Sequence, residues 1–511
     1  MVQIVTPEIP EKERLLKNFF NVIGVYGALW IIFHLTSVFF FGFIVGSPLL
    51  VGIFLGIGNI WSMLIDVPLS TIQRHASSKT MLSIANAMML VAAILFLYLV
   101  YSSFDAGFKL SGSILEITGK FFANGVNILL LFTIGILYGT VKEIYDIVTL
   151  SYLLNHSNPS EYDKVLSKNN IYFGVWTVVW VLLSIPVLWF QTQSVQFILF
   201  LLIFLIALSW IFIQYYFDNS HEVLSLDAVK NLHILDEVKD LEKSSQAYVQ
   251  KSISTLDFVQ IKNWAQYLIF KPKQIAAQFD WWDIWQKTKQ EYRMIYTLVL
   301  SKHSFVPILL WTTGWILLFG CWDNVATTFF VNFLDGSLKN VAWVKRIIQS
   351  GFILIGIIAI PAYVLQGFWI KKSEKFGRFE IIVVWLFFSW ISLFLLAIFG
   401  RMEDLSGLIL VVCMGLLNSA GYAAGYPMSQ AIFADEYSRA YAKANNTTII
   451  NADAAAAPLK ILNNFANSIG LIFGGALITF FGFTGMFIIY GSLLLAWGVV
   501  SLRKRTSWKL S

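Results

Sequence analysis

The sequence predicts an all-α membrane protein with twelve transmembrane helices arranged in two six-helix halves. Three observations predict this class: the apolar composition, the length of the apolar runs, and the position of the one long polar segment. Of the 511 residues, 57% are hydrophobic and only 13% are charged, and the mean hydropathy is +0.69. Charged residues make up about a quarter of a typical soluble domain. The composition therefore indicates a polytopic helical membrane protein.

Apolar runs that are long enough to cross a bilayer define the helices. A hydrocarbon core of roughly 30 Å needs about 20 apolar residues in a helix, whereas outer-membrane strands show shorter, alternating segments. The runs here are long and continuous, which favours helices. The predicted spans of the first half are 21–45, 48–67, 80–101, 121–150, 171–190 and 195–217. Those of the second half are 305–334, 345–370, 379–399, 405–435, 458–481 and 483–502.

These spans divide the chain into an N-terminal six-helix bundle (1–217), a cytoplasmic linker (218–303) and a C-terminal six-helix bundle (304–511). The linker carries apolar residues near a helical period, which predicts an amphipathic helix. Later in the linker, aromatic residues at 279–285 precede several basic residues. This order is typical of a helix in the lipid headgroup region, and aromatic packing beneath the bundle is an equally good alternative.

The distribution of basic residues orients the helices, because cytoplasmic loops carry the excess of Lys and Arg. We expect both termini to be cytoplasmic, because only six of the 36 basic residues would then be external: Lys109, Lys120, Lys339, Lys345, Arg346 and Arg401. The net charge of +6 reflects this topology and does not indicate nucleic-acid binding. We expect a monomeric, multi-pass protein of a cell membrane, specifically a bacterial inner membrane, with the lipid bilayer as its surroundings.

A charged loop after the eighth predicted span carries a family resemblance. The loop reads Glu374-Lys375-Phe376-Gly377-Arg378, an acidic-basic-x-Gly-basic sequence. A poorer copy after the second span keeps Arg74, with Asp66 upstream. Together with the six-plus-six topology, these features resemble the major facilitator superfamily over nearly the whole chain.

The resemblance implies transport by alternating access, with a cavity lined by spans one, four, seven and ten. It also implies that ion pairs at the charged loops stabilise the outward-facing state. The residues concerned are Asp66, Arg74, Glu374, Lys375, Gly377 and Arg378. The alternative is that these loops only anchor the cytoplasmic face by positive charge.

Ionisable groups at membrane depth are costly to bury, so each is a candidate site residue. His34 lies near the middle of the first span, where it can carry a proton or donate to a solute. Its alternative is a neutral histidine that is hydrogen-bonded to a neighbouring helix. Asp323 in the seventh span is the most isolated acid of any span and predicts proton coupling or cation binding. Capping of a broken helix near Gly320 is the competing interpretation.

The fourth and tenth spans hold the remaining candidates. Lys142, Glu143 and Asp146 share the fourth span. Lys142 and Asp146 are four residues apart and can pair on one helix face, which favours a structural or gating role. Gln430 in the tenth span adds hydrogen-bonding capacity, for which packing between helices is the main alternative.

The expected function is secondary active transport of a small solute by alternating access, with protons as the candidate coupling ion. The spans contain no cluster of Lys or Arg, which disfavours a multiply charged phosphate and favours a neutral, weakly cationic or amphipathic solute. A lipid flippase, or a non-transporting receptor or scaffold on the same fold, is the alternative. The sequence contains no phosphate-binding loop and no metal-binding or redox motif, so we expect no enzymatic activity and no cofactor or metal.

Overall fold

The computed structural model describes residues 9–73, 78–105, 114–155, 172, 179, 194–216, 281–300, 306–337 and 357–505, without positions 359, 363, 403 and 445–455. Within these ranges, seven helices are long and apolar enough to cross a membrane. Two more apolar helical stretches, Ile198–Trp210 and Val306–Trp322, are shorter. The predicted span 171–190 and the beginning of 345–370 lie largely outside the described residues.

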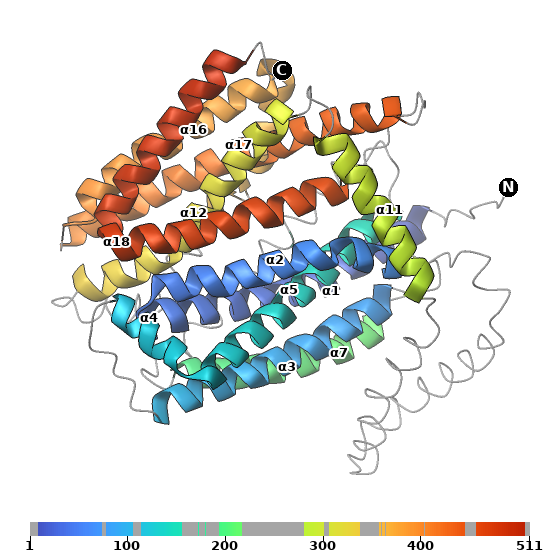
Figure 1. Cartoon of the computed structure of the whole chain (residues 1–511), viewed down its shortest axis with the longest axis horizontal. Coiled ribbons are helices and arrows are strands. Elements are labelled where there is room, and N and C mark those ends of the chain that lie inside the picture. The colour runs from blue at the N-terminus through green and yellow to red at the C-terminus, as the bar shows by residue number, and fades with distance from the viewer. Residues whose placement is uncertain are drawn as a thin grey trace, which may run out of the picture.

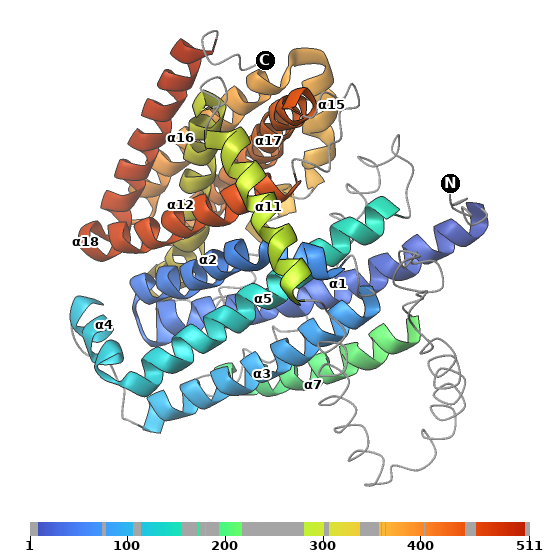
Figure 2. The same ribbon diagram turned by 45° about the vertical axis from the view of Figure 1, so that its right-hand side comes forward.

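The helices form two groups (Figures 1 and 2). The first group contains α1 (Ile9–Phe39), the π-helix η1 (Phe40–Ile44), α2 (Pro48–Gln73), α3 (Ser78–Asp105), α4 (Ile114–Ala123), α5 (Gly125–Asn155) and α7 (Ser194–Tyr216). The second group contains α12 (Val306–Ser337), α15 (Gln366–Phe376), α16 (Arg378–Phe399), α17 (Leu405–Ala444) and α18 (Ala456–Lys504). Between them in sequence, α11 (Trp281–Leu300) contacts α2 of the first group and α12 and α17 of the second.

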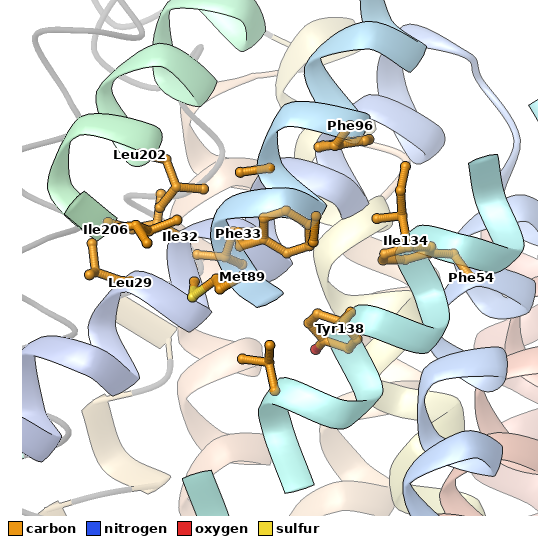
Figure 3. Close-up of a cluster of buried hydrophobic side chains, with 14 of the residues drawn as sticks. Leu29, Ile32, Phe33, Phe54, Met89, Phe96, Ile134, Tyr138, Leu202 and Ile206 are labelled. Atoms are coloured by element: carbon orange, nitrogen blue, oxygen red, sulfur yellow. The ribbon is translucent and has the colours of Figure 1, made fainter. Parts of the chain in front are cut away.

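Each group has its own apolar core. In the first group, Phe33 of α1, Phe96 of α3 and Ile134 of α5 pack together, and α7 adds Leu202 and Ile206 (Figure 3). In the second group, the core forms mainly around buried side chains of α12, α16, α17 and α18. The two groups meet where α2 and the first part of α18 lie side by side (Figure 1).

One helix boundary differs from the predicted spans and another coincides with them. The predicted span 121–150 is divided, and the long helix α5 begins only at Gly125. The side-chain oxygen of Asn124 accepts the backbone N–H of Val126 at 3.0 Å, which caps α5 and separates it from α4. The predicted spans 458–481 and 483–502 meet at Gly482, whose φ of 65° and ψ of 178° interrupt α18. Glycine suits this position because a side chain disfavours positive φ.

Close packing of α2 on α5 predicts a sensitive glycine. A Cβ at Gly139 would lie 2.2 Å from the carbonyl oxygen of Gly58, and backbone cannot yield as a flexible side chain can. Gly139→Ala should therefore lower the free energy of unfolding by roughly 1–3 kcal/mol. At exposed Gly119 in α4, a Cβ would meet nothing within 4 Å, so Gly119→Ala should stabilise by about 0.5–1 kcal/mol. Denaturant titration in detergent micelles would measure the free energy of unfolding of both variants. Equal changes in the two variants would contradict the close packing of α2 on α5 at Gly139.

Candidate functional site

A buried ion pair joins the two helix groups, between the second half of α5 and the start of α18. The ammonium nitrogen of Lys460 lies 2.5 Å from Oε1 of Glu143 and 3.4 Å from Oδ2 of Asp146. The Glu143 side chain is 0% exposed, and that of Lys460 is 21% exposed. A carboxylate this deeply buried needs a cation beside it, because an unpaired buried charge is very costly. Lys460 of the second group supplies that cation.

Two buried asparagines extend the pair into a network. The ammonium group of Lys142 donates to the Oδ1 atoms of Asn59, at 2.7 Å, and Asn464, at 3.2 Å. The side-chain amide of Asn464 in turn donates to Oε2 of Glu143 at 3.4 Å. Since Asn59 belongs to α2, Lys142 to α5 and Asn464 to α18, the network ties three helices from both groups.

Asp66 of α2 completes what we call the charge cluster: Asp66, Lys142, Glu143, Asp146 and Lys460. Asp66 is 2% exposed. Its carboxyl group interacts with that of Glu143 and lies in the field of Lys460. One of its oxygens, Oδ2, has no hydrogen-bond partner among the described residues. The cluster therefore brings three acidic groups and two ammonium groups into one largely buried space.

Tyr292 of α11 reaches the same place from outside the apolar helices. Its hydroxyl donates to the backbone carbonyl oxygens of Met63, at 3.2 Å, and Leu64, at 3.1 Å. Burial, together with the negative charges of Asp66 and Glu143, raises the pKa of Tyr292 to about 12. This tyrosine attaches α11 to the end of α2 beside the charge cluster.

The raised pKa of Tyr292 predicts that its hydroxyl loses its proton only at strongly alkaline pH. The folded state holds the neutral phenol more firmly than the unfolded state, so the stabilisation is complete below pH 10 and is lost as the pH rises toward 12. The difference between the ultraviolet titrations of the wild-type protein and Tyr292→Phe should show one phenol with a pKa near 12. A difference curve centred near pH 10 would place this phenol in water instead.

A second polar site lies between α1 and α5. The Nδ1 atom of His34 is 2.9 Å from the Tyr138 hydroxyl, and the Trp30 ring stacks on both rings, with centroid distances of 5.6 and 5.4 Å. Tyr138 and Lys142 are four residues apart, one turn of α5, so this aromatic site adjoins the charge cluster. Tyr138 itself is also part of the apolar core (Figure 3).

The second helix group carries an aromatic cluster of its own. Phe319 of α12 stacks on Tyr422 of α17 at 4.2 Å and lies 4.9 Å from Tyr426. Several buried polar atoms on α1, α5, α12 and α18 have no hydrogen-bond partner among the described residues, and they include Nε1 of Trp30, Oδ1 of Asn463 and Oδ1 of Asn467. Such atoms are available to bind a polar ligand. In the same described part of the chain, no group of His, Cys, Asp and Glu could hold a metal ion.

Comparison with known proteins identifies the architecture. No family model and no curated protein matches the sequence, but solved structures match nearly all of it. The nucleoside transporter NupG aligns over 96% of this chain and 98% of its own, with a TM-score of 0.59 and 13% identity. The chain has the major facilitator fold.

Two further transporters agree with this assignment. A partially occluded, inward-open structure of the xylose transporter XylE from E. coli aligns over 96% of this chain and 97% of its own, with a TM-score of 0.56 and 13% identity. A POT family transporter in complex with a thioalcohol-conjugated peptide covers 96% of each chain, with a TM-score of 0.57 and 13% identity. At such identities the likeness concerns the fold, and it confirms the resemblance drawn from the sequence. All three neighbours are transporters.

Within this major facilitator fold, the predicted site residues separate into distinct places. The structure gathers Asp66, Lys142, Glu143 and Asp146 in the charge cluster and places His34 at the aromatic site. Gln430 lies one turn beyond Tyr426 on α17. Asp323 belongs to α12, but its side chain is outside the described ones, as is the whole of Arg74.

The loop that carried the family motif makes its ion pair within one helix group. Arg378, at the start of α16, pairs with Asp435 of α17. Gly377 adopts φ 93°, which ends α15 and lets α16 begin. Glu374 and Lys375 are exposed at the end of α15. The ion pair between the helix groups that the structure describes thus involves Lys460, not these loop residues.

Lys460 is the important residue that the sequence reasoning missed. It stands two residues after Pro458, where a lysine commonly anchors the end of a span, so its position alone carries no distinct signal. A usable signal was the polar stripe at helical spacing inside an apolar run: Lys460, Asn463, Asn464 and Asn467. Tyr138 and Tyr292 carried no comparable signal, because isolated tyrosines are common at helix ends and in cores.

Proposed function

We propose that the protein is a secondary active transporter that moves a small solute by alternating access. In this proposal residues 1–217 and 304–511 form two six-helix halves with twelve spans, the segment 218–303 connects them, and both termini are cytoplasmic. The charge cluster is the observation that carries the proposal. It would close the cytoplasmic side, because its ion pairs cross between the halves and can be exchanged for water when the halves separate.

The aromatic sites on α1 and α5 and on α12 and α17 would bind the solute. Stacked rings offer flat apolar surfaces, and the unpaired polar atoms of Trp30, Asn463 and Asn467 offer one donor and two acceptors. This combination suits an uncharged polar or amphipathic solute. The neighbours named above include transporters of nucleosides and xylose, so nucleosides and pentoses are the first solutes to test.

Proton coupling would use His34, with Asp323 as the second candidate. Histidine is the side chain best suited to bind and release a proton near neutral pH. His34 contacts Tyr138, which is one turn of α5 from Lys142 of the charge cluster. Protonation of His34 could thereby change the field at the closure between the halves. This short connection supports a link between proton binding and the opening of the cytoplasmic side.

Uptake into proteoliposomes tests the proposed function. The purified protein is reconstituted, an inward proton gradient is imposed, and radiolabelled nucleosides, xylose and dipeptides are added in turn. We expect accumulation of at least one uncharged solute, together with proton influx. Asp323→Asn and His34→Gln identify the coupling residue, and Phe387→Ala, which removes a ring 53% exposed on α16, is the matched control. Folded protein that accumulates no solute but moves fluorescent lipids between leaflets would instead indicate a flippase.

A further inference from the structure

One face of α11 combines aromatic and basic side chains in a single exposed stripe. The lipid-facing stripe, as we call it, contains Trp282, Trp285, Lys289, Arg293 and Tyr296. Successive members are three or four residues apart, so all lie along one side of the helix. The three aromatic residues are 59–70% exposed, and Lys289 and Arg293 are exposed as well.

The face of α11 that adjoins the stripe packs against the rest of the protein. Thr288 is 3% exposed, and Tyr292 donates to the two carbonyl oxygens of α2 described above. The helix contacts α2 of the first group and α12 and α17 of the second. In both ribbon views it runs obliquely across the boundary between the groups (Figures 1 and 2). The lipid-facing stripe thus belongs to a helix fixed to both groups.

The attachment through Tyr292 sets the depth of the stripe. Its acceptors Met63 and Leu64 lie five and six residues before Leu69, which ends the apolar segment Pro48–Leu69 of α2. At 1.5 Å per residue, the middle of α11 is roughly 8–9 Å along α2 from the end of that segment. This depth is that of the boundary between headgroups and acyl chains.

At this depth, the residue types of the stripe indicate which part of the bilayer it would contact. Tryptophan and tyrosine concentrate at the membrane–water boundary, where one end of the ring system is apolar and the other is wet. Lys289 and Arg293 are one turn apart and would face the phosphate layer, where arginine can bind phosphate oxygens through two parallel hydrogen bonds. The stripe holds no described acidic residue to offset these charges.

We propose that the lipid-facing stripe of α11 binds anionic phospholipid headgroups in the leaflet at that end of the helices. The rings of Trp282, Trp285 and Tyr296 would lie among the upper acyl chains, and Lys289 and Arg293 would contact the phosphates. Because α11 contacts both helix groups, bound lipid would stabilise the position of α11 against both groups. These are the same two groups that the charge cluster joins.

Quenching by brominated lipids tests this proposal without requiring transport. A bimane fluorophore is attached at Gln290→Cys, an exposed position beside the stripe, in a Cys413→Ser background; the remaining cysteine, Cys321, is buried. The protein is reconstituted in phosphatidylcholine with equal fractions of either dibrominated phosphatidylglycerol or dibrominated phosphatidylcholine. We expect quenching by both lipids, with an apparent affinity for phosphatidylglycerol roughly tenfold or more above that for phosphatidylcholine, since each basic residue near the surface contributes substantially.

Two double variants, each lacking two basic residues, test whether the preference for phosphatidylglycerol depends on the stripe. Lys289→Gln/Arg293→Gln should remove the preference for phosphatidylglycerol, whereas Arg503→Gln/Lys504→Gln, which deletes two exposed basic residues at the end of α18, should preserve it. Equal quenching by the two lipids in the unmodified stripe would overturn the proposal. So would the absence of quenching by either lipid, which would place the stripe against water or protein.

Discussion

Replacing Lys460 by methionine should lower the free energy of unfolding by roughly 3–5 kcal/mol, because it leaves a fully buried carboxylate without its cation. Glu143 is 0% exposed and lies 2.5 Å from the lysine nitrogen. Asp66 and Asp146 would then face the same uncompensated site. Denaturant titration in detergent micelles measures the loss, and proteoliposome uptake should fall to background.

A second substitution separates loss of charge balance from loss of packing. Glu143→Gln introduced into the Lys460→Met chain removes the orphaned charge, so most of the lost stability should return. Lys371→Met is the matched control, because Lys371 is exposed on α15 and should change stability by less than about 0.5 kcal/mol. Additive losses in the double variant would show that Lys460 and Glu143 do not act as a pair.

His34→Gln should uncouple solute movement from the proton gradient. Glutamine can still hydrogen-bond to the Tyr138 hydroxyl, but it cannot bind a proton at physiological pH. Proton-driven accumulation should fall about tenfold or more, whereas exchange of solute across the membrane without a gradient should continue, because that reaction does not require the proton.

Tyr138→Phe is the companion to this variant. It keeps the imidazole and removes only the hydroxyl at 2.9 Å, so accumulation driven by the proton gradient should persist. If His34→Gln accumulates solute normally and Asp323→Asn does not, proton binding belongs to α12 and His34 serves only to hold α1 against α5.

Much of the fold follows from the sequence, because a bilayer imposes its length on every apolar run. The predicted segments 48–67, 80–101 and 379–399 lie within a few residues of apolar helical segments of the structure. The prediction 405–435 begins at the first residue of α17, which continues to Ala444. The bend in α18 falls at Gly482, between two predicted spans. The break before α5 was not predicted, because Asn124 and Gly125 lie in an otherwise apolar run and only the capping hydrogen bond marks the boundary.

The candidate site was only partly predictable. Glu143 and Asp146 were recognised as ionisable groups near membrane depth, but a pairing of Lys142 with Asp146 along the helix was the obvious reading. In the structure, Asp146 instead forms an ion pair with Lys460, which lies more than 300 positions later in the chain. Periodicity describes one helix at a time, whereas the charge cluster depends on how α2, α5 and α18 pack against one another.

Alternating access requires the two helix groups to separate at the charge cluster. The direct test attaches spin labels at Leu64→Cys on α2 and Phe465→Cys on α18, both exposed positions, in a Cys413→Ser background. Double electron–electron resonance then measures the distance between the labels with and without a transported solute. The same measurement is made in the Lys460→Met/Glu143→Gln chain, which should be folded but lacks the ion pair between the groups. We predict two distance populations, with the longer one increased by solute and dominant in the double variant. A single distance that neither solute nor the double variant changes would contradict alternating access at this site.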